Sequence, residues 1–487
     1  MGGPIPALDA RARSCAERLA RAERVLLASH IDADGLTSAA IAAEALDRAA
    51  IPFETVFAKQ LDPDAIAGIA ERDFRTVLFT DFGSGQLDDI ADHEAAGAFT
   101  PVVADHHQPA DAGTEFHLNP LLEGLNGATE LSGAGTTYVL ARALGSEMRN
   151  TSGTASGEER SDELQADNRD LAALAVVGAV GDMQDSSGEL VGANREIVAE
   201  GVDAGVLAET TDLALYGKQS RPLPKLLEYA NDVRIPGISG SERGAIGFLS
   251  DLDIELERDG EWRRWVDLTA DERQTVASAL LQRAVARGVP ANRIDDLVGT
   301  TYTLTNEAEG TELRDASEFS TLLNATARYD RADVGLAVCR GDRDDALDEA
   351  RTLLTNHRKN LATGLDWVKE EGVTQGEHVQ WFDAGEAIRE TIVGIIAGMA
   401  LGTDALRGDR PVIAFAAKND TESKVSARGT HRLVRSGLDL SAVMGEVARA
   451  LGGDGGGHDV AAGATIPKGD EEAFVERADA VVADQLG

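Results

Sequence analysis

The sequence predicts an α/β protein with three parts. These are an N-terminal doubly wound domain with a parallel sheet, a mostly helical connector, and a smaller C-terminal α/β domain. Short apolar runs alternate with helical patterns between residues 25 and 142, which is typical of βαβ units. A long charged helical stretch at 342–371 precedes a second set of strand and helix patterns. Because 487 residues suffice for two or more domains, we expect domains at 1–220, 221–370 and 371–487.

The first domain begins with a helical lead-in at 1–24, where Ala, Leu and Arg recur at helical spacing. Four apolar runs read as buried strands, and three segments between them have helical patterns. The expected strands are 25–29, 53–57, 76–80 and 101–104, and the expected helices are 36–50, 63–72 and 87–96.

A further helix should start at Ser132-Gly133-Ala134-Gly135-Thr136 and run to about residue 144. Its free N-terminal amides could hold a phosphate, or Ser132 could simply cap the helix. Residues 145–167 are polar and nearly free of large apolar side chains, which predicts a flexible insertion. A helical stretch from 194 to 217 then closes the domain, and three prolines at 222, 224 and 236 punctuate the connector.

The remainder of the chain predicts a helical connector and a small α/β domain. Residues 240–330 are mixed and mostly helical, and the helix at 342–371 should separate the two domains. After it we expect a buried helix at 388–400, strands at 411–416 and 424–428, and a helix at 443–451. The glycines from Gly452 to Gly457 should form a loop whose amides could approach an anion.

Composition restricts the class of protein. No run of apolar residues is long enough to span a membrane, and residues 1–20 lack the apolar core of a secretory signal. The two cysteines, Cys15 and Cys339, predict neither a disulfide framework nor a zinc site, which fits a reducing cytoplasm.

The formal net charge of −38 is extreme, and only eight residues are lysine. Proteins that bind nucleic acid by charge neutralisation are usually basic. An acidic, lysine-poor surface resembles that of halophilic archaea, where molar salt shortens the Debye length to about 3 Å. Binding to a nucleic acid would then depend on metal–phosphate contact and short-range arginine bonds.

Acidic and histidine side chains follow several of the apolar segments. Asp105-His106-His107 follows the run at 101–104, and His30-Ile31-Asp32-Ala33-Asp34 follows the run at 25–29. Asp81 ends the strand at 76–80, and Asp182 ends an Ala-rich helical segment. Taken singly, each acid could be a turn or capping residue. Parallel sheets bind ligands at the carboxyl ends of their strands, and so many converging carboxylates require cations to balance them.

These motifs resemble the DHH phosphoesterase superfamily. His30-Ile31-Asp32-Ala33-Asp34-Gly35, Asp81, Asp105-His106-His107 and Asp182 match its four motifs in order. Gly455-Gly456-Gly457-His458, with Ala461-Ala462-Gly463 behind it, looks like the DHHA1 substrate domain of the RecJ-type branch. The segment at 312–325 looks like one found in archaeal RecJ-like nucleases. The resemblance covers nearly the whole chain, and with the acidic composition it points to a RecJ-like protein of haloarchaeal type.

The resemblance implies a site with two Mn²⁺ ions, with Mg²⁺ as the alternative. His30, Asp32 and Asp81 would hold one ion, and Asp34, Asp81, His106 and Asp182 the other, so that Asp81 bridges. Asp105 would be a ligand or would orient His106, and His107 would face the substrate phosphate. The expected catalytic residues are Asp105, His106, His107 and Asp81, and the expected substrate-binding residues are His107, Ser426, Arg428, Gly455, Gly456, Gly457 and His458.

Three functional hypotheses follow. The first is a RecJ-like exonuclease of DNA repair or replication that acts on single-stranded DNA or RNA, with a GINS-type replication factor as a partner. The second is a phosphodiesterase for oligoribonucleotides or cyclic dinucleotides. The third is a replisome scaffold of the same ancestry without catalysis. The full set of acids and histidines argues against the scaffold, and the chain length favours the exonuclease over the phosphodiesterase.

Overall fold

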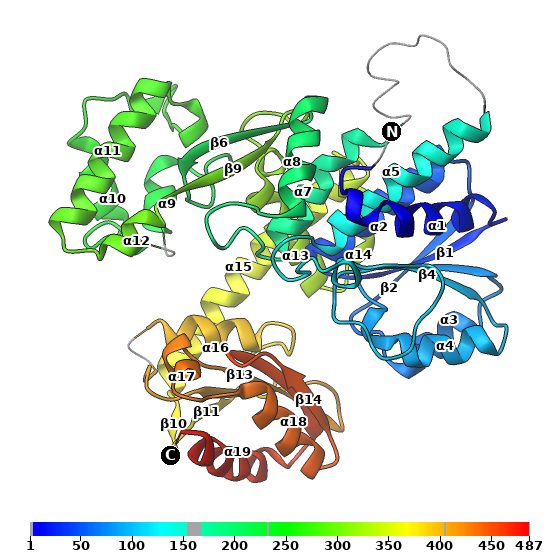
Figure 1. Cartoon of the computed structure of the whole chain (residues 1–487). Helices are drawn as coiled ribbons and strands as arrows, with labels where there is room; N and C mark the ends of the chain where they lie inside the picture. The colour runs from blue at the N-terminus through cyan, green and yellow to red at the C-terminus, as the bar shows by residue number, and fades with distance from the viewer. Residues whose placement is uncertain (1–2, 153–166, 231–232, 404–405, 487) are drawn as a thin grey trace. The chain divides into compact units, whose positions relative to one another are not determined.

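The computed structural model describes residues 3–152, 167–230, 233–403 and 406–486 (Figure 1). The chain divides into two compact units, Met1–Arg351 and Thr352–Gly487. Within the described residues, none of the helices combines the length and the apolar character that crossing a membrane requires.

The first unit is built on a five-stranded parallel sheet, which confirms the predicted fold class. The strand order is β2-β1-β3-β4-β5, and every neighbouring pair is parallel. The strands are β1 (Val25–His30), β2 (Phe53–Ala58), β3 (Thr76–Thr80), β4 (Thr100–Ala104) and β5 (His117–Leu118). All five residues of β3 are buried, as expected for a strand covered on both faces. The short edge strand β5 was not predicted from the sequence.

Helices cover both faces of this sheet (Figure 1). One face carries α1 (Asp9–Ala20), α2 (Ala33–Arg48) and α5 (Gly133–Ser152). The other face carries α3 (Pro63–Ala70) and α4 (Leu87–Ala95), which close an apolar cluster that includes Phe79 and Phe99. The helix α7 (Ala172–Gly181) packs against α2 and α5 and is buried along most of its length.

Two predictions for this unit were wrong. The segment 145–152 continues helix α5 instead of starting a flexible insertion, because its buried first turns already nucleate the helix; 153–166 lie outside the described residues. The expected helix at 194–217 ends as α8 (Ala193–Ala204), and β6 (Leu207–Leu213) follows it. The threonines of β6 suit a strand, and its partner β9 (Val298–Leu304) lies far along the chain.

Between β6 and β9 the chain forms a helical region with an apolar core of its own around buried Trp265. It contains α9 (Leu223–Glu228), α10 (Glu242–Ser250), α11 (Ala270–Ala286) and α12 (Ala291–Asp295), with a hairpin of β7 (Glu257–Arg258) and β8 (Glu261–Trp262). After β9, α13 (Ala316–Arg328) and α14 (Ala332–Cys339) return to pack against the first part of the unit, α13 on α7 and both on α2.

The predicted long helix is α15 (Asp345–Glu371), and the division between the two units falls within it. The second unit has a six-stranded mixed sheet of order β10-β11-β12-β13-β15-β14. Its strands are β10 (Thr374–Gln375), β11 (Gln380–Asp383), β12 (Val412–Ala417), β13 (Glu422–Arg428), β14 (Asp454–Gly457) and β15 (Ala461–Pro467). One face packs on α16 (Val393–Leu401) and the other on α18 (Leu440–Ala450) and α19 (Glu471–Leu486), while α17 (His431–Arg435) follows β13.

Two predictions for the second unit need correction. The buried helix α16 begins at Val393 instead of at residue 388. Ile388 and Ile392 still pack in the same core, although they lie before the helix, so their apolar pattern extended the prediction. Asp454–Gly457 form the edge strand β14 instead of a loop. A Cβ on Gly455 would lie 2.7 Å from the Met444 carbonyl oxygen, so close packing of β14 on α18 accounts for a glycine there.

Candidate metal centre

The carboxyl ends of β1, β3 and β4 bring the predicted acids and histidines together at one edge of the sheet. His30 ends β1, Asp81 follows β3 and Asp105 follows β4. Three groups have potential ligand atoms within 4.8 Å of one another. They are Asp81 with Asp105, His106 and His107; His30 with Asp32 and Asp81; and Asp34 with His106 and Asp182.

The group around His30 is built from the turn between β1 and α2. His30 Nδ1 lies 3.1 Å from Asp32 Oδ2 and 3.6 Å from Asp81 Oδ2. Asp32 is the N-cap of α2 and accepts a hydrogen bond from the Gly35 amide at 3.0 Å. A Cβ on Gly35 would lie 2.3 Å from the His30 carbonyl oxygen, so this tight turn requires glycine.

Asp81, like His106, belongs to two of these groups. Its backbone has φ of +59°, an uncommon conformation for a residue other than glycine that often marks functional sites. Its carboxylate is buried, and no described residue donates a hydrogen bond of normal geometry to Oδ1. A Cβ on Gly133 would lie 2.3 Å from that oxygen, so only glycine fits beside it.

Asp34 connects α2 to the N-terminus of α5. Its carboxylate accepts hydrogen bonds from the Gly133 amide at 2.7 Å and the Ala134 amide at 2.9 Å. The Gly135 amide donates to Ser132 Oγ. The N-terminal amides of α5 are therefore engaged by protein groups, and the suggested phosphate site at Ser132–Thr136 is wrong.

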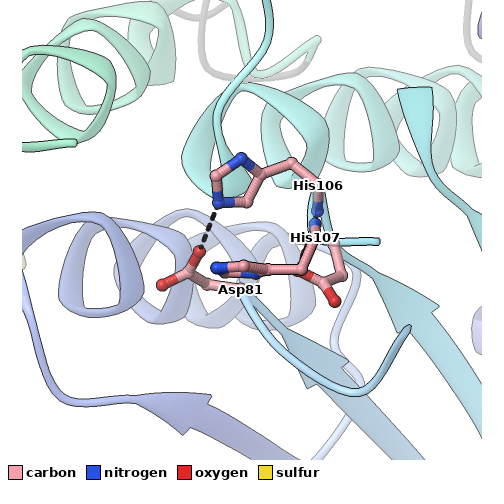
Figure 2. Close-up of side chains that lie close together, drawn as sticks. Asp81, His106 and His107 are labelled. Carbon is pink, nitrogen blue, oxygen red and sulfur yellow. Dashed lines mark hydrogen bonds and ion pairs between the residues drawn. The ribbon is translucent and has the colours of Figure 1, made fainter. Parts of the chain in front are cut away.

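His106 is oriented by its own hydrogen bond. Its Nδ1 lies 2.7 Å from the Gly127 carbonyl oxygen, which can only accept, so Nδ1 carries the proton. Its Nε2 then points to Asp81 Oδ1 at 3.3 Å (Figure 2). Asp34 Oδ2 lies 3.8 Å from the same nitrogen. A metal-binding imidazole is usually held in this way, by a carbonyl on the nitrogen that does not bind the metal.

Asp105 is committed to holding the turn that carries the two histidines. Its Oδ1 accepts from the amides of His106 and His107 and lies 2.8 Å from His107 Nδ1, and Oδ2 accepts from the Ser84 amide. Asp105 thus orients the ring of His107 and the backbone of His106. His107 is partly exposed, and its ring lies close to the Asp81 carboxylate (Figure 2).

The crowded carboxylates shift the pKa values of the group. Burial and then the charge of Asp81 raise the pKa of Asp34 well above its usual range. Burial alone would lower the pKa of His30, but hydrogen bonds to Asp32 and Asp81 raise it to about 11. Burial opposes the shift at Asp81 too, yet the neighbouring imidazoles of His106 and His30 hold its pKa below the usual range.

The donor set fits divalent cations. Five carboxylates and the imidazoles of His30 and His106 converge here. The carboxylates raise the pKa of both imidazoles, so the site favours a positive charge at each ring. Cations would supply that charge while the imidazoles stayed neutral, and Asp81 Oδ1 is a buried acceptor without a donor. Mixed oxygen and imidazole ligands suit Mn²⁺ and tolerate Mg²⁺.

The candidate substrate residues of the second unit gather at one end of its sheet. Arg428 pairs with Ala461 across β13 and β15, and the turn of His458 joins β14 to β15. Gly456 pairs with Gly463, and a Cβ on Gly456 would meet open space. Ser426 is buried and faces α16. A Cβ on Gly394, which belongs to that helix, would lie 2.9 Å from the Ser426 hydroxyl oxygen.

Several polar residues of the site carry no signal in the sequence. Ser84 Oγ lies 2.9 Å from His117 Nε2 and accepts from Asn119, which also donates to the His107 carbonyl oxygen. Gln184 donates to the Gly127 carbonyl oxygen and to Asp182. None of these residues belongs to a motif, because each acts through a contact between distant segments.

Known proteins resemble this chain in both sequence and fold. Three family models match: the DHH family, N-terminal domain at 24–177, the DHH-CID domain at 215–298 and the DHHA1 domain at 378–484. The uncharacterized protein MJ0831 of Methanocaldococcus jannaschii is 29% identical over 466 residues, which cover 94% of this chain and 93% of that protein.

Solved structures also have a similar fold. RecJ of Thermus thermophilus in complex with Mn²⁺ matches with a TM-score of 0.59 and 18% identity, over 99% of this chain and 55% of that chain. The chain thus spans about half the length of that RecJ. CDC45 from Entamoeba histolytica matches with a TM-score of 0.62 and 10% identity, over 97% of each chain. From its three family domains in this order, the chain belongs to the DHH superfamily, and its fold is RecJ-like.

Proposed function

We propose that this protein is a metal-dependent phosphodiester hydrolase that acts as an exonuclease on single-stranded DNA or RNA. The observation that carries the proposal is the convergence of His30, Asp81 and His106 with further carboxylates at the strand ends. His30, Asp32 and Asp81 would hold one Mn²⁺, and Asp34, Asp81, His106 and Asp182 a second. Two such cations activate water and stabilise the charges that develop on a phosphate.

The protein groups divide the remaining work. His107 Nδ1 donates to Asp105, which raises the pKa of that exposed ring, so its imidazolium form would donate from Nε2 to a phosphate oxygen. Arg428, His458 and the glycines of β14 would bind the nucleic acid through charge-assisted and backbone hydrogen bonds. A solved exonuclease RecJ bound to manganese has the same fold over 94% of its chain, which supports the choice of metal and reaction.

The replisome scaffold is the second candidate, and the match to CDC45 over nearly all of both chains favours it. A scaffold has no need for a buried carboxylate in a left-handed backbone conformation or for two oriented histidines. We therefore rank hydrolysis first and keep a GINS-type replication factor as a proposed partner. The acidic, lysine-poor composition supports a halophilic archaeal source.

End-labelled DNA and RNA single strands, incubated with the full chain and Mn²⁺ in high salt, test the proposal. We expect mononucleotides to be released from one end, with the reaction abolished by a chelator and restored by Mn²⁺. Strands labelled at the 5′ or 3′ end will define the polarity. Release of nothing from either strand by a protein that still binds Mn²⁺ would favour the scaffold, whereas cleavage of cyclic dinucleotides alone would favour the small-substrate phosphodiesterase.

A further inference from the structure

Gln184 is a buried residue beside the candidate metal centre, where it contacts Asp182 and the carbonyl group that holds His106. It follows α7 and is 3% exposed. Its Nε2 donates to the Gly127 carbonyl oxygen at 2.8 Å and to Asp182 Oδ2 at 2.9 Å. The same Gly127 oxygen accepts from His106 Nδ1. One amide group therefore contacts Asp182 directly and His106 through a shared acceptor.

A second buried amide sets the orientation of the first. Asn194, at the start of α8, is 2% exposed and donates from Nδ2 to Gln184 Oε1 at 2.6 Å. Because the oxygen of Gln184 is held by this donor, both N–H groups of Gln184 point to Gly127 and Asp182. The backbone amide of Asn194 donates to the Glu130 carbonyl oxygen, which anchors α8 to the loop before α5.

The backbone around Gln184 is equally constrained. Met183 has φ of +58° and reverses the chain after α7, and the Gln184 amide donates to the Ala179 carbonyl oxygen at 3.0 Å. Burying two primary amides costs desolvation and side-chain entropy unless every group is paired. Here the hydrogen bonds of Gln184 converge on Asp182 and on the carbonyl group that holds His106. Apolar side chains in the same place would not restrain those two residues.

We propose that Gln184 is a positioning residue that fixes Asp182 and the ring of His106 relative to each other, with Asn194 orienting Gln184. The inference rests on the proposed function, since it assigns these two side chains to a common cation. Residues behind metal ligands typically change metal affinity by about 10- to 100-fold when they are mutated.

Calorimetric titration of the metal-free full chain with Mn²⁺, paired with thermal unfolding in chelator, tests the proposal. Gln184→Met keeps the length of the side chain but removes both donors, and we expect Mn²⁺ to bind about 10- to 100-fold more weakly. Gln380→Met is the matched control, because Gln380 is also fully buried and donates from Nε2 to two carbonyl oxygens, but it belongs to the second unit. That control should lower Tm and leave Mn²⁺ affinity unchanged.

Asn194→Asp provides a second route that touches neither Asp182 nor His106. It removes the donor to Gln184 Oε1, so we expect a smaller loss of Mn²⁺ affinity, and none beyond that of Gln184→Met in the double variant. Wild-type Mn²⁺ affinity in both single variants would overturn the inference while leaving the proposed function intact. No Mn²⁺ binding by the wild-type protein would overturn the proposed function, and this inference with it.

Discussion

At the scale of single residues, Asp81 is the group on which the proposed centre depends most. It belongs to two of the three candidate ligand groups, and its Oδ1 is buried without a donor. Its left-handed backbone conformation is tolerated by asparagine as well as by aspartate. The fold should therefore survive a change that removes only the charge of this side chain.

Asp81→Asn should lose at least one of two Mn²⁺ ions and essentially all hydrolysis, because two cations would repel each other without the shared carboxylate. Thermal stability in chelator should fall without loss of the fold, because the neighbouring imidazoles of His106 and His30 favour the ionised carboxylate of Asp81 in the folded protein. Calorimetry and the nuclease assay on one preparation measure this. Asp170→Asn is the control, because Asp170 is outside the candidate ligand groups and forms an ion pair with Arg48, with 2.7 Å between Oδ2 and the guanidinium nitrogen. Two bound ions and near-normal turnover in Asp81→Asn would refute the bridging assignment.

Arg428→Ala should separate substrate binding from metal binding. A charge-assisted hydrogen bond contributes roughly 1.5–3 kcal/mol, so we expect KM for oligonucleotides to rise by about one to two orders of magnitude. Mn²⁺ affinity should stay the same, because Arg428 lies in the second unit. Arg407→Ala is a suitable control, since Arg407 pairs with Asp409 on the surface of the same unit. A fall in Mn²⁺ affinity would contradict this division of roles.

At the scale of elements, a buried carboxylate joins α13 to the segment before α9. Glu318 is 0% exposed and accepts hydrogen bonds from the Gln219 amide at 2.8 Å and from the Ser220 hydroxyl. Burial raises the pKa of Glu318 from 4.5 to about 7. The folded protein therefore binds this proton more tightly than the unfolded chain does, so stability from this group falls as pH rises between those two values.

Glu318→Gln should remove this pH dependence. Denaturant unfolding across that range should show the wild-type free energy of unfolding losing up to about 1.4 kcal/mol per pH unit more than the variant. Glu272→Gln should change the dependence in the opposite sense, because the hydrogen bond from Arg263 lowers the pKa of Glu272 to about 2. Its stabilisation is lost as pH falls through the acidic range. Parallel curves for wild-type protein and Glu318→Gln would show that Glu318 does not titrate in this range.

At the scale of the whole molecule, the net charge of −38 should make stability depend on salt. The Debye length falls from about 10 Å at 0.1 M salt to about 3 Å at 1 M, so self-repulsion between surface carboxylates is screened. We expect Tm to rise as KCl increases over this range and little change with a neutral solute of equal osmolarity. A Tm that is independent of KCl would argue against a halophilic source.

Elements with a local pattern could be predicted from the amino-acid order alone. The strands β1, β3 and β4 and the acids that follow them could be predicted from short apolar runs, and the charge pattern predicted helix α15. The order of the motifs identified the superfamily. Because parallel strands deliver their carboxyl ends to one edge, the approach of His30, Asp81 and His106 could also be expected.

Features that depend on contacts between distant segments emerged only in the folded chain. Asp34 caps a helix about a hundred residues away, which closes the supposed phosphate site. The strand β6 exists because β9 supplies its hydrogen bonds, and the glycines of β14 are needed where that strand packs on α18. Gln184 belongs to the site through amide hydrogen bonds alone. Periodicity and propensity describe neighbours along the chain, whereas the hydrogen bond from Gln184 to Gly127 joins groups that only folding brings within 3 Å.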